Sequence, residues 1–96
     1  MKLLDNFQNY ADSLSPTSKQ KFAHLAKEGQ NPNYLFITCS DSRVVPESIL
    51  GCEAGDLFTI RVAGNYIPEY QQDSGVSIWS SVDFAVNSLP ITDIVV

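Results

Sequence analysis

The chain has 96 residues, of which 44% are hydrophobic and 18% charged, a composition typical of one small globular domain. Its net charge is −5 and its six Lys and Arg form no basic cluster, so nucleic acid and anionic membrane surfaces are not expected as partners. The first residues lack the apolar core of a secretory signal peptide, and no apolar run approaches the ~20 residues of a membrane-spanning helix. We therefore expect a cytoplasmic protein in which Cys39 and Cys52 are free thiols.

Two helices are predicted at the start of the chain. Apolar residues recur at helical spacing from about residue 2 to residue 14, namely Leu3, Phe7, Tyr10, Ala11 and Leu14. A second helix is expected to have Ser15 as its N-cap and Pro16 at its first position, and to end at Gly29 in a left-handed cap. His24 lies on this second helix, and we interpret it as a structural histidine rather than a metal ligand.

The rest of the chain alternates strands with helices. Short runs rich in β-branched and aromatic residues predict strands at three places, residues 34–37, 57–62 and 91–96. A short helical piece is expected over residues 46–50, and a longer helix is expected to be capped by Asp73 or Ser74. The apolar face of that longer helix is predicted to consist of Val76, Trp79, Val82, Val86 and Leu89, with Ala85 beside it. This alternation predicts an α/β fold, a parallel sheet with flanking helices.

The most distinctive stretch follows the first predicted strand and runs from Thr38 to Glu47. Cys39 offers a thiolate that suits zinc, Asp41 offers a carboxylate, and Arg43 offers a guanidinium that can bind a carboxylate through two hydrogen bonds. These residues stand at the carboxyl end of a strand, where open α/β sheets bind ligands. The residue types alone leave two interpretations open, a metal site or a loop with a buried cysteine and a surface salt bridge.

The full sequence of this stretch, Cys-Ser-Asp-Ser-Arg over residues 39–43, resembles the first metal-site motif of the β-class carbonic anhydrases. Residues 55–58, followed by Arg-Val-Ala-Gly-Asn over residues 61–65, are similar to a second motif of that family. Residues 75–96 are similar to the helix and strand that come next. The resemblance covers the chain from roughly Phe22 to its end, and its motifs are specific in combination.

The resemblance implies a fold, a reaction and an assembly. The implied fold is an incomplete β-carbonic-anhydrase-like α/β fold, a single partial domain over residues 1–96 with an N-terminal helical arm of about residues 1–29. The implied reaction is the zinc-dependent, reversible hydration of carbon dioxide to bicarbonate. The N-terminal helix of the family commonly reaches a second subunit, which implies a homodimer or a larger homo-oligomer for the complete protein.

The resemblance also implies roles for particular residues. Cys39 would be a thiolate ligand of zinc, and Asp41 would orient the attacking hydroxide while Arg43 holds the Asp41 carboxylate. If that pair breaks, Asp41 would become a further zinc ligand and block the water site. Arg61 would belong to the support around this loop. Val62 departs from the family pattern, which usually has Asn there, so a polar contact is expected to be absent or replaced.

The other zinc ligands of the resembled family, a His and a second Cys, would come after the point where this chain ends, at Val96. His24 and Cys52 cannot replace them by spacing, and a catalytic zinc normally has three protein ligands. We therefore expect a fragment of a longer enzyme that is inactive alone. Two other interpretations stay open: a non-catalytic interaction module that keeps the first motif, and a hydrolase of a related small molecule such as carbon disulfide.

Overall fold

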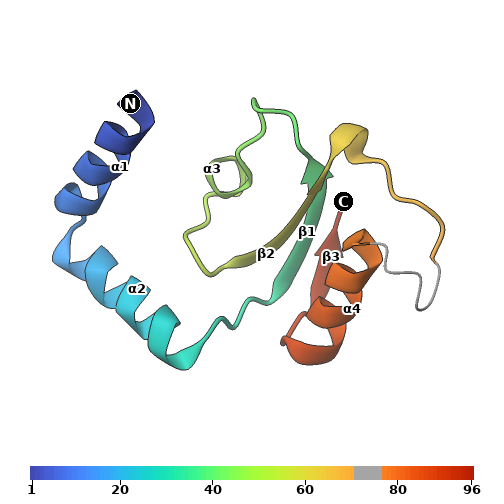
Figure 1. Ribbon diagram of the computed structural model, residues 1–96. Helices are drawn as coiled ribbons and strands as arrows, with labels where there is room; N and C mark the ends of the chain where they lie inside the picture. Colours follow the sequence, from blue (N-terminus) through green and yellow to red (C-terminus); the bar gives the residue numbers. More distant parts are fainter. Residues whose placement is uncertain (71–76) are drawn as a thin grey trace. The chain divides into compact units, whose positions relative to one another are not determined.

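The computed structural model describes residues 1–70 and 77–96 of the chain (Figure 1). These residues form two compact units, Met1–Gln30 and Asn31–Val96. The first unit contains two helices, and the second contains the sheet and the loops that follow its strands. In the described part of the chain, no helix is both long and apolar enough to cross a membrane.

The N-terminal unit consists of α1, Lys2–Ser13, and α2, Pro16–Glu28, which confirms both predicted helices. Ser15 caps α2 as expected, because its Oγ accepts a hydrogen bond of 3.1 Å from the backbone N–H of Ser18. Gly29 ends α2, but with φ 82° and ψ 179°, so the predicted left-handed cap is wrong. The chain there leaves the helix in an extended direction that only glycine adopts readily at positive φ. Within this unit no helical residue is buried.

Three parallel strands form the sheet of the second unit, in the order β2-β1-β3 (Figure 1). They are β1, Tyr34–Cys39, β2, Leu57–Val62, and β3, Asp93–Val95. The predicted parallel sheet is therefore confirmed, and β2 has the predicted bounds. β1 runs two residues further than predicted, through Thr38 and Cys39, because both residues pair in register with the end of β2.

β3 is shorter than the predicted strand over residues 91–96. Before pairing with β1 begins, the backbone N–H and the Oγ1 of Thr92 both donate to the carbonyl of Asn33, at 2.8 and 3.2 Å. These bonds attach Thr92 to the residue just before β1, and strand pairing begins only at Asp93. All three residues of β3 are exposed, so this strand forms an open edge that includes apolar side chains, Ile94 at 52% and Val95 at 42%.

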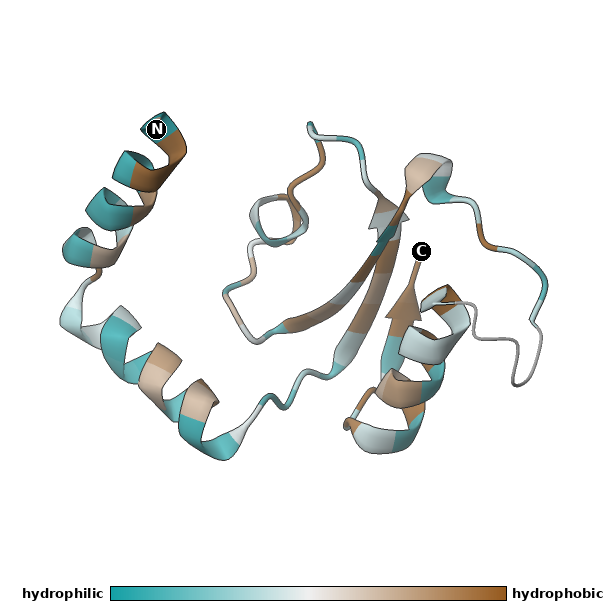
Figure 2. Cartoon of the chain, in the orientation of Figure 1, coloured by the Kyte–Doolittle hydropathy of each residue, from teal (hydrophilic) through white to brown (hydrophobic). Residues whose placement is uncertain are grey.

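The hydrophobic core lies between one face of the sheet and α4, Ser77–Ser88 (Figure 1). Hydrophobic residues are concentrated along β2, which contributes to this core (Figure 2). The fully or almost fully buried members come from both layers: Leu35, Ile37, Ile60, Ile78, Val82 and Ala85. β1 and β2 are therefore fixed against a helix, and the positions of their carboxyl ends follow from that packing.

The apolar face predicted for α4 is partly wrong. Val86 is 47% exposed, whereas Ala85 is fully buried. The buried residues Ile78, Val82 and Ala85 follow one helical stripe that continues to the half-buried Leu89, with spacings of four, three and four residues. The predicted caps and one predicted core position, Asp73, Ser74 and Val76, lie outside the described residues.

Two short segments complete the second unit. The helix α3, Pro46–Leu50, ends at Gly51 in a left-handed conformation with φ 63° and ψ 34°, which confirms the predicted helical piece. On the opposite face of the sheet from α4, Leu50 shares an apolar hollow with β1 and β2 residues. The 3-10 turn η1, Ala63–Asn65, directly follows β2. η1 therefore lies at the carboxyl end of β2, whereas Leu50 of α3 lies beside Tyr34 and Leu57, the first residues of β1 and β2.

Candidate active site

The candidate site lies at the C-terminal edge of the sheet, where β1 and β2 end side by side (Figure 1). Cys39 is the last residue of β1 and pairs in register with Val62, the last residue of β2. The loop over residues 40–45 follows β1 and carries Asp41 and Arg43. The structure therefore brings the three predicted site residues to the edge at which open α/β sheets bind ligands.

The half-buried thiol of Cys39 is surrounded by backbone amides. The largest influence is the backbone N–H of Asp41, which donates to Cys39 Sγ at 3.4 Å and lowers the pKa of the thiol. Desolvation and the negative charge of Asp41 oppose this effect, while the backbone amides of Gly64 and Asn65 lower the pKa further. The net result is a lowered pKa, which favours the thiolate, the form that binds metals.

η1 brings its two amides to Cys39 through an unusual backbone. Gly64 has φ 62° and Asn65 has φ 53°, so two successive residues are left-handed. Glycine and asparagine are the residues that adopt this conformation most readily. The prediction of a break over Ala63–Asn65 is confirmed, but sequence reasoning did not connect this break with Cys39. The sequence did contain a signal for this contact. The break follows a strand predicted to run parallel to the one that ends near Cys39, so the two carboxyl ends were expected at the same edge of the sheet.

Asp41 and Arg43 form a bidentate ion pair. Asp41 Oδ1 accepts hydrogen bonds from the backbone N–H of Arg43 at 2.8 Å and from Arg43 Nε at 3.0 Å. Asp41 Oδ2 accepts from Arg43 Nη2 at 2.7 Å. The side chain and then the backbone of Arg43, with a smaller effect of the Arg61 charge, lower the pKa of Asp41 to about 2 despite some desolvation. Asp41 is therefore a carboxylate at any pH near neutrality.

Cys39 is the described residue of this site that fits a zinc ion directly, and Asp41 could join it only if its pair with Arg43 broke. Cys39 has the lowered pKa expected of a thiolate ligand, and the carboxylate of Asp41 lies two residues away. Among residues 1–70 and 77–96, the His, Cys, Asp and Glu side chains form no group of three or more that could hold a metal ion. Within the described part of the chain, Cys39 therefore has no complete set of candidate metal ligands around it.

Two other residues of metal-binding type, His24 and Cys52, lie outside the loop over residues 40–45. His24 is exposed on α2 in the N-terminal unit. Cys52 is half-buried after α3, and its thiol donates to the carbonyl of Leu50 at 3.6 Å. Cys39 and Cys52 are both free.

Comparison with known proteins identifies the family. The sequence model of a family described as carbonic anhydrase matches residues 34–96. The carbonic anhydrase of Pseudomonas aeruginosa is 47% identical over 95 residues, which cover 98% of this chain and 42% of that protein. The solved structure of the β-carbonic anhydrase CcaA matches with a TM-score of 0.86 and 39% identity, over 97% of this chain and 44% of that one. The chain belongs to the β-class carbonic anhydrase family.

Other carbonic anhydrases match over similar parts of their length. The carbonic anhydrase of Synechococcus elongatus is 40% identical over 95 residues, 99% of this chain and 34% of that protein. A structure of tetrameric β-carbonic anhydrases from Sordaria macrospora matches with a TM-score of 0.80 and 29% identity, over 97% of this chain and 45% of that one. The chain thus spans less than half the length of these relatives. The comparisons confirm the family resemblance and the α/β fold class.

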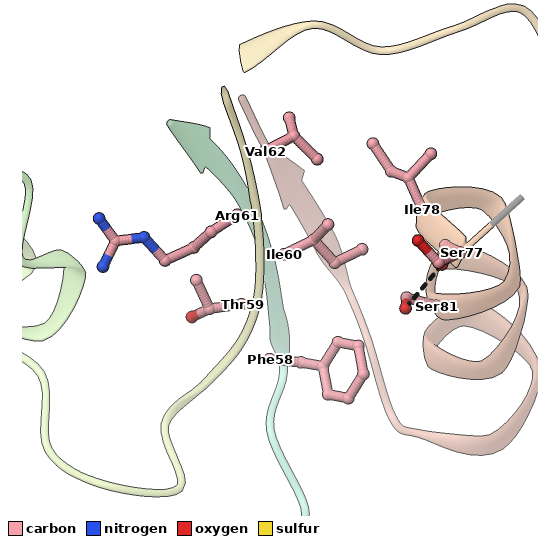
Figure 3. A pocket seen from close by; sticks show the side chains of 8 residues that line it. All are labelled: Phe58, Thr59, Ile60, Arg61, Val62, Ser77, Ile78 and Ser81. Carbon is pink, nitrogen blue, oxygen red and sulfur yellow. Dashed lines mark hydrogen bonds between the residues drawn. The ribbon is translucent and has the colours of Figure 1, made fainter. Parts of the chain in front are cut away.

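Val62 has an apolar role in this β-class carbonic anhydrase chain. Its side chain lies on the α4 side of β2, as do those of Phe58 and Ile60 (Figure 3). It is half-buried and packs against the hydrophobic core. Val62 therefore contributes apolar packing at the end of β2.

Proposed function

We propose that the protein containing this chain is a zinc-dependent carbonic anhydrase that reversibly hydrates carbon dioxide to bicarbonate and a proton. The observation that carries this proposal is the bidentate Asp41–Arg43 pair beside Cys39 at the C-terminal edge of the sheet. Family membership supports the same reaction. The substrates of the proposed enzyme are carbon dioxide and bicarbonate.

Each of the three residues has a distinct role in the proposed mechanism. Cys39 would hold zinc through its thiolate, together with ligands from outside the described residues. When bound, zinc supplies a hydroxide nucleophile near neutral pH. Asp41 would accept a hydrogen bond from the attacking hydroxide and orient it toward the carbon of the substrate. Arg43 occupies both carboxylate oxygens of Asp41 and keeps this side chain from binding zinc itself.

The proposal includes a cytoplasmic location, a single partial domain with an N-terminal arm, and assembly into a homo-oligomer. Two free thiols suit a reducing compartment. The N-terminal unit, Met1–Gln30, leaves large apolar side chains exposed, among them Leu3 at 72% and Phe7 at 66%. A second subunit would cover such side chains, and the similar β-carbonic anhydrases of Sordaria macrospora are tetrameric.

The test of this proposal uses the full-length protein that contains this sequence, loaded with zinc. Stopped-flow measurement with a pH indicator is expected to show carbon dioxide hydration, and Asp41→Asn is expected to lower kcat by roughly 100-fold or more, because a neutral amide cannot replace the carboxylate. Asp83→Asn, which changes an exposed Asp on α4, serves as the matched control and should leave kcat unchanged.

The same preparation separates the proposal from its two alternatives. A non-catalytic interaction module would contain little zinc and show no hydration. A hydrolase of carbon disulfide would contain zinc and consume that compound without hydrating carbon dioxide. Either result in the unmodified protein would contradict the proposed function, whereas stoichiometric zinc with carbon dioxide hydration would support it.

A further inference from the structure

Arg61 is the second arginine near the candidate site. It lies one residue before the end of β2, and its Cα pairs in register with the buried Thr38 of β1. Its side chain points away from α4, on the opposite side of the strand from Ile60 and Val62 (Figure 3). The guanidinium of Arg61 instead reaches the loop that follows β1.

Three backbone carbonyls of one short segment converge on this guanidinium. Arg61 Nε donates to the carbonyl of Cys39 at 3.1 Å. Arg61 Nη2 donates to the carbonyls of Asp41 at 2.9 Å and Val44 at 2.8 Å. These carbonyls belong to the predicted zinc ligand, to the carboxylate residue, and to the residue after Arg43. One side chain thus contacts the backbone at the beginning, middle and end of the segment.

The geometry of these contacts requires arginine. A guanidinium is planar and carries its five N–H donors in a fixed arrangement, so the directions of its bonds are coupled. A lysine ammonium has three donors on a flexible stem and cannot hold the same relative directions. The carbonyl of Asp41 also accepts from the backbone N–H of Val44 at 3.0 Å. Arg61 therefore binds a turn that is already formed and fixes it relative to β2.

Arg61 remains exposed, and exposed charged side chains contribute little to global stability. Its bonds nevertheless restrain where the Asp41–Arg43 pair stands relative to Cys39. We infer that Arg61 is a positioning residue, whose three hydrogen bonds to the carbonyls of Cys39, Asp41 and Val44 hold the loop in the geometry that the reaction requires. This inference rests on the proposed function for its effect on turnover, but the restraint on the loop can be measured independently.

The experiment compares Arg61→Ala and Arg61→Lys with the unmodified full-length protein. Hydrogen exchange measured by mass spectrometry follows the amides of residues 40–45, and stopped-flow assays give kcat and KM. Arg61→Ala is expected to raise exchange in this segment roughly tenfold or more, because charge-assisted hydrogen bonds are lost. Its kcat should fall roughly 10–100-fold, the usual effect of losing such support, with KM little changed. Arg61→Lys should give intermediate values, and added guanidinium, unlike sodium chloride, should restore part of the kcat of Arg61→Ala.

Thr59→Val is the matched control. Thr59 also lies on β2 and, like Arg61, points away from α4, and its buried Oγ1 has no hydrogen-bond partner within the described residues (Figure 3). Its exchange and kcat should therefore stay at the unmodified values. Equal losses in Thr59→Val and Arg61→Ala would overturn the inference, since a general disturbance of β2 would explain both.

The possible results distinguish a failure of the positioning role of Arg61 from a failure of the proposed function. Unchanged exchange in Arg61→Ala, or faster exchange with an unchanged kcat in an active enzyme, would overturn the positioning role of Arg61. If the unmodified protein hydrates no carbon dioxide, the proposed function fails, and faster exchange in Arg61→Ala would still support the restraint on the loop. If Arg61→Ala does not fold, the same measurements of hydrogen exchange and kcat are made on Arg61→Lys.

Discussion

Asp41 and Arg43 form an ion pair in which 88% of the Arg43 side chain and 32% of the Asp41 side chain are exposed. Exposed ion pairs contribute little to stability, because water screens the charges and the side chains lose conformational freedom. The value of this pair lies in orientation, since three hydrogen bonds from Arg43 fix the plane of the Asp41 carboxylate. A substitution that keeps only the positive charge would not preserve that geometry.

The first prediction concerns the titration of Asp41. In zinc-free protein, Arg43→Ala should raise the pKa of Asp41 from about 2 toward its ordinary value of 3.8, because the Arg43 side chain is the largest cause of the lowering. Since the pKa is lowered in the folded state, the pair contributes stability above about pH 3.8, and this contribution is lost as the pH falls through about 2. NMR titration of the carboxyl carbon measures the pKa, with Arg43→Lys as the control that keeps the charge. An unchanged pKa in Arg43→Ala would show that the pair does not persist in solution.

The second prediction concerns the thiolate. In the full-length protein, Cys39→Ser should lower zinc affinity by more than the roughly 10–100-fold that follows loss of an outer-shell contact, because a neutral hydroxyl replaces a direct thiolate ligand. Cys52→Ser is the matched control and should retain zinc. Metal analysis after dialysis against a weak chelator measures both variants. Full zinc occupancy in Cys39→Ser would remove this residue from the set of direct ligands.

At the scale of secondary-structure elements, the site depends on the common ending of β1 and β2. Cys39 and Val62 are paired at the last position of each strand, so the loop after β1 and the turn η1 start at the same level. The core under α4 fixes both strands through Leu35, Ile37 and Ile60. The site loop is therefore attached to a packed scaffold through strand pairing and through Arg61.

Sequence reasoning succeeded where the relevant contacts are local. The strand β2, the cap at Ser15 and the pairing of Asp41 with Arg43 each depend on residues a few positions apart. The family resemblance placed Arg61 in the support around the loop, but the sequence did not predict which carbonyls it contacts, because Arg61 Nε reaches a carbonyl 22 residues away and the parallel register brings the two together. One position on the face of α4 was misassigned for a similar reason: Val86 and Ala85 are both apolar, and the packing against the sheet decides that Ala85 is the buried one.

The third prediction concerns η1. Gly64→Ala should lower the free energy of unfolding by about 1–2 kcal/mol, because Gly64 is left-handed at φ 62° and an L-residue pays a steric cost there. A Cβ at this position would meet no atom within 4 Å, so the cost comes from the backbone alone. Urea unfolding of the zinc-free protein measures it. Gly64→Asn should cost less, since Asn tolerates this conformation better, and equal stability of Gly64→Ala would contradict the strain argument.

At the scale of the whole molecule, the described chain presents surfaces that its own residues leave open. The N-terminal unit exposes apolar side chains of α1, and β3 exposes Ile94 and Val95 at the edge of the sheet. An open apolar edge can pair with another strand, and natural proteins usually cover or charge such edges. The chain spans less than half the length of the relatives that it matches. The positions of β1 and β2 rest on contacts within the described residues.

The last prediction concerns residues 1–96 expressed alone. We expect this segment to show no measurable carbon dioxide hydration after zinc is added, because one thiolate and one carboxylate hold zinc too weakly for a catalytic site that normally has three protein ligands. The segment should also self-associate through its exposed β3 edge, which size-exclusion chromatography would detect, and Ile94→Lys should reduce that association. Stopped-flow assays of the segment beside the full-length protein measure the activity. Comparable turnover by the two would mean that a second copy of the segment supplies the remaining zinc ligands, with His24 and Cys52 as the residues to substitute next.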